Sequence, residues 1–148
     1  MKKKQVAMFT LLAGSLCLFG YQALAQLQYT AGPVSRVLLL KVKPGRFDAF
    51  MEDLRNNARP IYEEEKQQGL INEYHIYLNT TSSSPSDWDV AITFQYKNMA
   101  ALDGLAEKLD ALTLKRYGSK ESRQQVVEKR VENAELVASH LIREINLK

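Results

Sequence analysis

The stretch VLLLKVKPGRFDAF, residues 37–50, decides the fold, because its residue pattern changes period at Lys43-Pro44-Gly45. The aliphatic run 37–42 has the length and composition of a strand that is buried on both faces. After the turn, apolar residues recur every three or four positions, which predicts one buried face of a helix. That stripe consists of Phe47, Phe50, Met51, Leu54, Ala58 and Ile61. Pro60 lies inside the pattern and predicts a kink or a split in the helix.

The Lys43-Pro44-Gly45 segment has two interpretations, a ligand-cradling loop or a structural corner. A phosphate cradle needs several glycines, so that backbone N–H groups converge on the anion. The segment holds a single glycine, and Pro44 has no N–H to donate. Its residues are instead typical of a turn that ends a strand and starts a helix.

Two more strands are predicted in the middle of the chain. Residues 70–78 (LINEYHIYL) and 89–96 (DVAITFQY) show period-two patterns. In the second strand, Val90, Ile92, Phe94 and Tyr96 share one face, whereas Asp89, Ala91, Thr93 and Gln95 share the other. The polar, serine-rich residues 79–87 between the two strands predict a loop.

Helical patterns follow these strands. Asn98 can cap a helix that carries a leucine-rich stripe and ends at Gly118. Residues 119–133 predict an additional, charged helix, and residues 135–147 fit either a helix face or a strand face. The strand interpretation of 135–147 completes a split β-α-β plan, which is an α+β, ferredoxin-like sandwich with an antiparallel four-stranded sheet.

A strand, Lys43-Pro44-Gly45, the sequence Arg-Phe-Asp-Ala-Phe at 46–50, Gly69 and a tyrosine-rich strand together resemble the dimeric α+β barrel superfamily. Its members include antibiotic-biosynthesis-type monooxygenases and stress-responsive domains. The resemblance covers about residues 34–147. It implies a homodimer in which two ferredoxin-like sheets form a barrel, with a pocket inside the barrel or between sheet and helices. It carries over no catalytic motif.

The N-terminus has the layout of a secretory signal peptide. Lys2, Lys3 and Lys4 precede the apolar run 6–19, and Ala23-Leu24-Ala25 is typical of a cleavage site. The run is shorter than the roughly 20 residues of a membrane-spanning helix, so an uncleaved anchor is the lesser alternative. We expect residues 1–25 to be the signal peptide, 26–33 a flexible leader and 34–148 the domain. The mature protein is then periplasmic or secreted, with no stable membrane insertion.

Cleavage changes the composition in a way that excludes several functions. The precursor has 20 basic and 17 acidic residues, and removal of three lysines leaves 17 of each, so no basic excess remains for nucleic acid. Cys17 is the only cysteine and lies inside the predicted signal peptide. The mature chain therefore has no disulfide and no thiol nucleophile. Motifs of zinc proteases, serine hydrolases and dinucleotide enzymes are also absent.

The candidate ligand-binding residues are His75, Tyr77, Thr93, Gln95 and His140. As a strand, residues 70–78 place His75 on one face with Glu73 and Tyr77, and the C-terminal strand places His140 with Leu136, Ala138 and Ile142. Two histidines that line one cavity are suited to a proton-transfer pair, although a lone strand histidine is more often structural. Tyr74, Tyr77, Tyr96 and Trp88 are candidates for an aromatic pocket or, more simply, for core and interface packing.

These observations favour an exported homodimeric module that binds a small apolar or aromatic ligand, without cofactor or metal. A cofactor-independent oxygenase or isomerase of the same fold, with a histidine base, is one alternative. A structural dimeric domain without pocket chemistry is the other.

Overall fold

The computed structural model describes residues 28–148 of the chain. The predicted signal peptide, residues 1–25, lies outside this range. Within it, no helix is long and apolar enough to cross a membrane.

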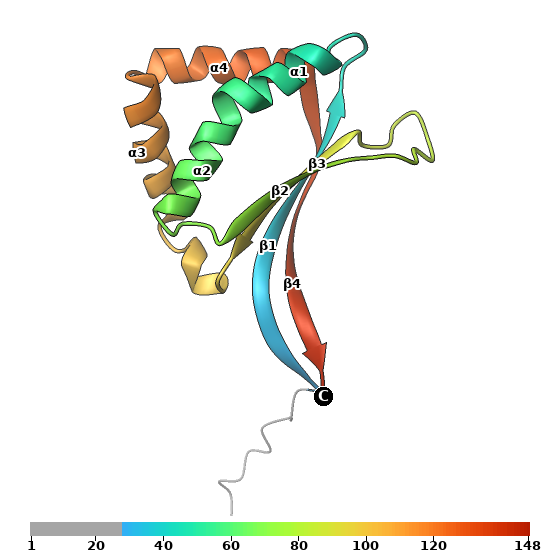
Figure 1. Cartoon of the computed structure of the whole chain (residues 1–148), viewed down its shortest axis with the longest axis vertical. Coiled ribbons are helices and arrows are strands. Elements are labelled where there is room, and N and C mark those ends of the chain that lie inside the picture. Colours follow the sequence, from blue (N-terminus) through green and yellow to red (C-terminus); the bar gives the residue numbers. More distant parts are fainter. Residues whose placement is uncertain (1–27) are drawn as a thin grey trace, which may run out of the picture.

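Four strands form a single antiparallel sheet. They are β1 (Tyr29–Val42), β2 (Glu73–Leu78), β3 (Val90–Tyr96) and β4 (Ala134–Leu147). Their order in the sheet is β2-β3-β1-β4, which is the order of the predicted ferredoxin-like plan. The ambiguous C-terminal segment is therefore a strand. Figure 1 shows the helices gathered over one part of the sheet, while β1 and β4 continue past them as a two-stranded arm.

The first helical segment is continuous and changes its geometry just before Pro60. It consists of α1 (Phe47–Asp53), the π-helical turn η1 (Leu54–Ala58) and α2 (Arg59–Gln67). Pro60 lies at the start of α2, where its missing N–H is tolerated because the wider π turn has already broken the regular hydrogen-bond pattern. The predicted disturbance at Pro60 is thus a π turn.

The second helical segment differs from the prediction at its start. Asn98 caps the 3-10 helix η2 (Met99–Leu102), accepting a hydrogen bond from the Ala101 N–H at 3.1 Å. Gly104, with φ of 64°, separates η2 from α3 (Leu105–Tyr117). The charged helix predicted near 119–133 is α4 (Lys120–Asn133), capped by Ser119.

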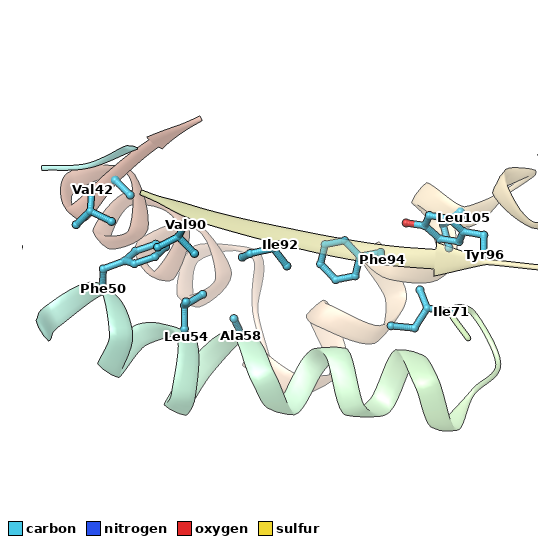
Figure 2. Packing of buried hydrophobic residues seen from close by; sticks show 11 residues of the cluster. Val42, Phe50, Leu54, Ala58, Ile71, Val90, Ile92, Phe94, Tyr96 and Leu105 are labelled. Carbon is cyan, nitrogen blue, oxygen red and sulfur yellow. The ribbon is translucent and has the colours of Figure 1, made fainter. Parts of the chain in front are cut away.

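The core lies between the sheet and the α1–η1–α2 segment. Figure 2 shows Phe50, Leu54 and Ala58 directed at Val90, Ile92 and Phe94 of β3. The helical stripe and the β3 alternation predicted from the sequence therefore meet in one apolar layer.

Strand β1 begins at Tyr29, so the chain from residue 29 to residue 33 is strand and not the predicted flexible leader. The Gly32-Pro33 pair occupies a register shift between Ala31 and Val34, where one residue of β4 faces two of β1. Pro33 is tolerated here because a residue in a bulge does not have to donate a backbone hydrogen bond to the neighbouring strand.

The Lys43-Pro44-Gly45 corner is a tight turn. The Arg46 N–H donates to the Lys43 carbonyl oxygen at 3.0 Å, and Gly45 has φ of 72°, which a residue with a side chain rarely adopts. Asp89 fixes the preceding strand end, because its carboxylate accepts from the Val42 N–H at 2.8 Å and from Lys41 Nζ at 2.9 Å.

Candidate functional site: the helix-free face of the sheet

All five candidate residues lie on the sheet face opposite the helices, which we call the helix-free face. His75 pairs with Thr93, Thr93 with Val37, and Val37 with His140. Paired residues point to the same side of a sheet, so these four side chains form one row across all four strands.

The two neighbouring rows contain the remaining candidates. Tyr77 begins the row Tyr77, Ala91, Leu39 and Ala138, and Gln95 belongs to the row Glu73, Gln95, Ser35 and Ile142. Tyr77 is 49% exposed and its ring centroid lies 6.0 Å from that of His75. The structure thus brings the candidates onto one surface; ligand binding by that surface stays a prediction.

The two histidines do not form a proton-transfer pair within one chain. His75 lies on edge strand β2 and His140 on edge strand β4, three strand spacings apart. Strands lie 4.7–4.9 Å apart, so the two backbones are separated by about 14 Å. A direct proton transfer needs heavy atoms within about 3 Å, which this separation rules out inside a single protomer.

The aromatic residues do not assemble into one pocket either. Tyr74 faces the helices, where its ring lies 5.2 Å from that of Tyr62 and its hydroxyl donates to Glu63 Oε1 at 2.6 Å. Tyr96 is in the core, whereas Tyr77 is on the helix-free face. Residues 74 and 77 are an odd number of positions apart, so strand alternation alone places them on opposite faces.

A bulge in β4 also changes the predicted neighbours of His140. Ala138 pairs with Leu39, but Leu136 pairs with Leu40, so Val137 is an extra residue in β4. Leu136 therefore lies on the helix side, while Ala138 and Ile142 accompany His140 on the helix-free face. Strict alternation along the sequence assigns Leu136 to the wrong face, because one extra residue in the strand moves every residue before it to the opposite face of the sheet.

Comparisons with known proteins bear on the fold. No protein-family model and no curated protein matches the chain. Among solved structures, HapK from Hahella chejuensis is 12% identical, with a TM-score of 0.50 over 75% of this chain and 91% of its own. A NIPSNAP family protein with unknown function from Agrobacterium tumefaciens is 8% identical, with a TM-score of 0.52 over 79% of this chain and 90% of its own. The protein has a ferredoxin-like α+β fold. This confirms the fold that the resemblance implied.

The ferredoxin-like domain also holds a polar cluster that sequence reasoning missed. Asp53 is 8% exposed, and its carboxylate accepts from Arg130 Nε at 2.7 Å and from Asn57 Nδ2 at 2.9 Å. Burial raises the pKa of neighbouring Tyr62 to about 12, although the positive charge of Arg130 opposes part of the rise. The helical period could have indicated that Asp53 is buried, because Asp53 lies three residues after Phe50 in the buried helix stripe. The cluster joins α1 to α4 and is suited to a structural role.

Glu65 is a second buried acid in the helix layer. It is 7% exposed, and burial raises its pKa to about 7. Its position four residues after Ile61 continues the buried stripe, so the helical period could have identified it. Among the described residues, no group of three or more histidine, cysteine, aspartate or glutamate side chains is arranged to hold a metal ion.

Proposed function

We propose that the protein is exported and acts as a homodimer whose two helix-free faces oppose each other and enclose a small apolar or aromatic ligand. One observation carries this proposal. The aliphatic run of β1 has the composition of a strand buried on both faces, yet the helices cover only the side with Leu38, Leu40 and Val42. All four of these side chains at 37–40 are partly exposed in the single chain, but Leu38 and Leu40 pack against the helix-side core, whereas Val37 and Leu39 lie on the face that no helix covers. A second sheet would complete their burial.

The chemistry of the helix-free face supports a partner sheet and an apolar ligand. Its central rows contain Val37, Leu39 and Ala91, flanked by the exposed Tyr77, and carry no carboxylate or ammonium group. The charged Glu73 lies at the margin on β2. Ligand pockets are largely apolar with a few placed polar groups. Here Thr93, Gln95 and the two histidines would supply those groups.

The first experiment is native mass spectrometry of the protein purified from its own cellular compartment. We expect a chain that begins at Gln26, a dimeric mass and additional mass from a bound compound. A bare dimer would favour the structural alternative. A chain that retains residues 1–25 would contradict export with cleavage, and a monomer would contradict the dimer and the enclosed site.

A variant pair tests which face forms the dimer. Val37→Asp places a charge in the centre of the helix-free face and should give a monomer. Ala111→Asp places the same charge on an exposed position of α3 and should leave the dimer intact. Equal behaviour of the two variants in light scattering would contradict the proposed interface.

Histidine variants test whether the ligand binds on the helix-free face. We expect His75→Ala and His140→Ala to remove the bound mass or weaken its retention while the protein remains folded and dimeric. If the purified compound is instead consumed by the wild type, and turnover is lost in one variant only, the oxygenase or isomerase alternative replaces simple binding.

A further inference from the structure

A groove of about 410 Å³ lies at the β4 edge of the sheet, away from the central rows of the helix-free face. It is lined by Val34, Met99, Leu141, Ile142 and Arg143. Val34 is 1% exposed and pairs with both Tyr96 and Arg143, so it belongs to the helix side of the sheet. Met99 comes from η2, which forms the opposite wall. The volume is in the range of sites for small organic ligands.

The side chains of the groove combine an apolar surface with an unpaired cation. Met99 and Leu141 are 45% and 46% exposed, so their apolar surfaces are open to a ligand. Arg143 has no carboxylate partner anywhere in residues 28–148. The groove therefore offers a guanidinium group beside an exposed apolar wall.

A second arginine strengthens the positive potential at this place. Arg36 pairs with Leu141, two residues from the Val34–Arg143 pair and on the same sheet face. Diagonal neighbours of this kind lie about 7–8 Å apart. Arg36 also lacks a carboxylate partner within the described chain, whereas Arg123 and Arg130 each have one. Two like charges thus lie on one face of the sheet, and neither forms an ion pair within the described chain, which favours an anionic ligand.

We propose that this groove binds a free medium-chain carboxylate. The apolar chain packs against Met99 and Leu141 over the buried Val34, and the carboxylate accepts hydrogen bonds from Arg143. A guanidinium presents two parallel N–H donors that match the two oxygens of a carboxylate, which fixes the orientation of the ligand. Arg36 contributes charge next to the headgroup. Of the groove residues only Ile142 belongs to the helix-free face, at its β4 margin, and Arg143, Met99 and Leu141 do not, so this site does not depend on the proposed function above.

The test is a titration of the full chain with octanoate, followed by the ¹³C-methyl resonance of Met99. The resonance is assigned by its loss in Met99→Leu. We expect a saturable shift with octanoate and at least tenfold weaker binding of octanamide, which has the same chain without the charge. Arg143→Gln should weaken octanoate binding at least tenfold. Arg55→Gln, at an exposed position of η1, is the matched control and should bind octanoate as the wild type does.

Several results would overturn the proposal. One is equal affinity for octanoate and octanamide, and another is unchanged octanoate affinity in Arg143→Gln. A Met99 shift that depends on protein concentration alone would assign the groove to a second copy of the chain. Perturbation of the His75 and His140 resonances without a Met99 shift would place octanoate on the helix-free face. If Arg143→Gln does not fold, Met99→Asp serves instead, and calorimetry should show loss of octanoate binding.

Discussion

Arg130 donates from Nε to Oδ2 of Asp53 at 2.7 Å, and this bond joins α4 to α1 across 77 residues of sequence. Arg130→Met should lower the free energy of unfolding by about 3 kcal/mol, because it leaves the buried carboxylate of Asp53 without its counter-charge. Arg123→Met is the matched control. Its partner Asp110 has a side chain that is 76% exposed, so the loss should be under about 1 kcal/mol.

The double variant Asp53→Leu/Arg130→Met separates a lost charge pair from lost packing. Replacing both partners with apolar side chains should recover most of the stability that Arg130→Met loses, because no buried charge remains. Chemical denaturation measures all three variants. If the double variant is less stable than Arg130→Met alone, the unpaired carboxylate is not the cause.

Glu65 should make the stability of the domain depend on pH. Its pKa rises from 4.5 to about 7 on folding, so the folded chain binds more protons than the unfolded chain between these values. Stability should therefore fall as pH rises from about 4.5 to 7, by roughly 1–3 kcal/mol in total. Glu65→Gln should remove this decline and be more stable than the wild type at pH 8.

The matched control for Glu65 is Glu132→Gln, at an exposed position near the end of α4. It should retain the decline of the wild type. Thermal denaturation at a series of pH values measures this decline in stability. A wild-type stability that does not change between pH 4.5 and 7 would show that burial does not favour the protonated form of Glu65.

Gly45 tests whether the Lys43-Pro44-Gly45 corner is only structural. No atom beyond Gly45 and its two chain neighbours lies within 4 Å of the position that a Cβ would take, so Gly45→Ala should lose stability only through its positive φ, by about 1–2 kcal/mol. Gly45→Asn should lose less, because asparagine tolerates this conformation better than alanine. Equal losses in the two variants would indicate a steric cause, and a change in ligand binding at unchanged stability would revive the ligand-loop interpretation.

The sequence predicted the parts of the structure that depend on local period. Strand alternation placed Thr93 and Gln95 opposite the core, and the helical stripe from Phe50 to Ala58 packs as expected. It did not predict the bulge at Val137 or the strand character of Tyr29, because both depend on pairing between the two ends of the chain. Local propensity contains no information about a partner strand 100 residues away.

In the candidate site, too, the local period could be predicted from the sequence and the long-range arrangement could not. Each of the five candidate residues could be assigned to a strand face, and all five share the helix-free face. The order of the strands could not be read from alternation, and it is this order that puts His75 and His140 on opposite edges. A period-two pattern gives the face of a residue but never its distance from a residue on another strand.

The separation of His75 and His140 leads to a prediction about their coupling. Residues more than 7–10 Å apart that share no partner usually have additive effects on stability. The two backbones are about 14 Å apart, so in the ligand-free protein the double variant His75→Ala/His140→Ala should lose the sum of the two single losses, within about 0.5 kcal/mol. Denaturation of the wild type and the three variants gives the coupling energy directly. A coupling energy above about 1 kcal/mol would mean that the two histidines meet, which a single chain does not allow. That coupling should then disappear in the Val37→Asp background, where the proposed dimer is absent, and its persistence there would contradict the strand order itself.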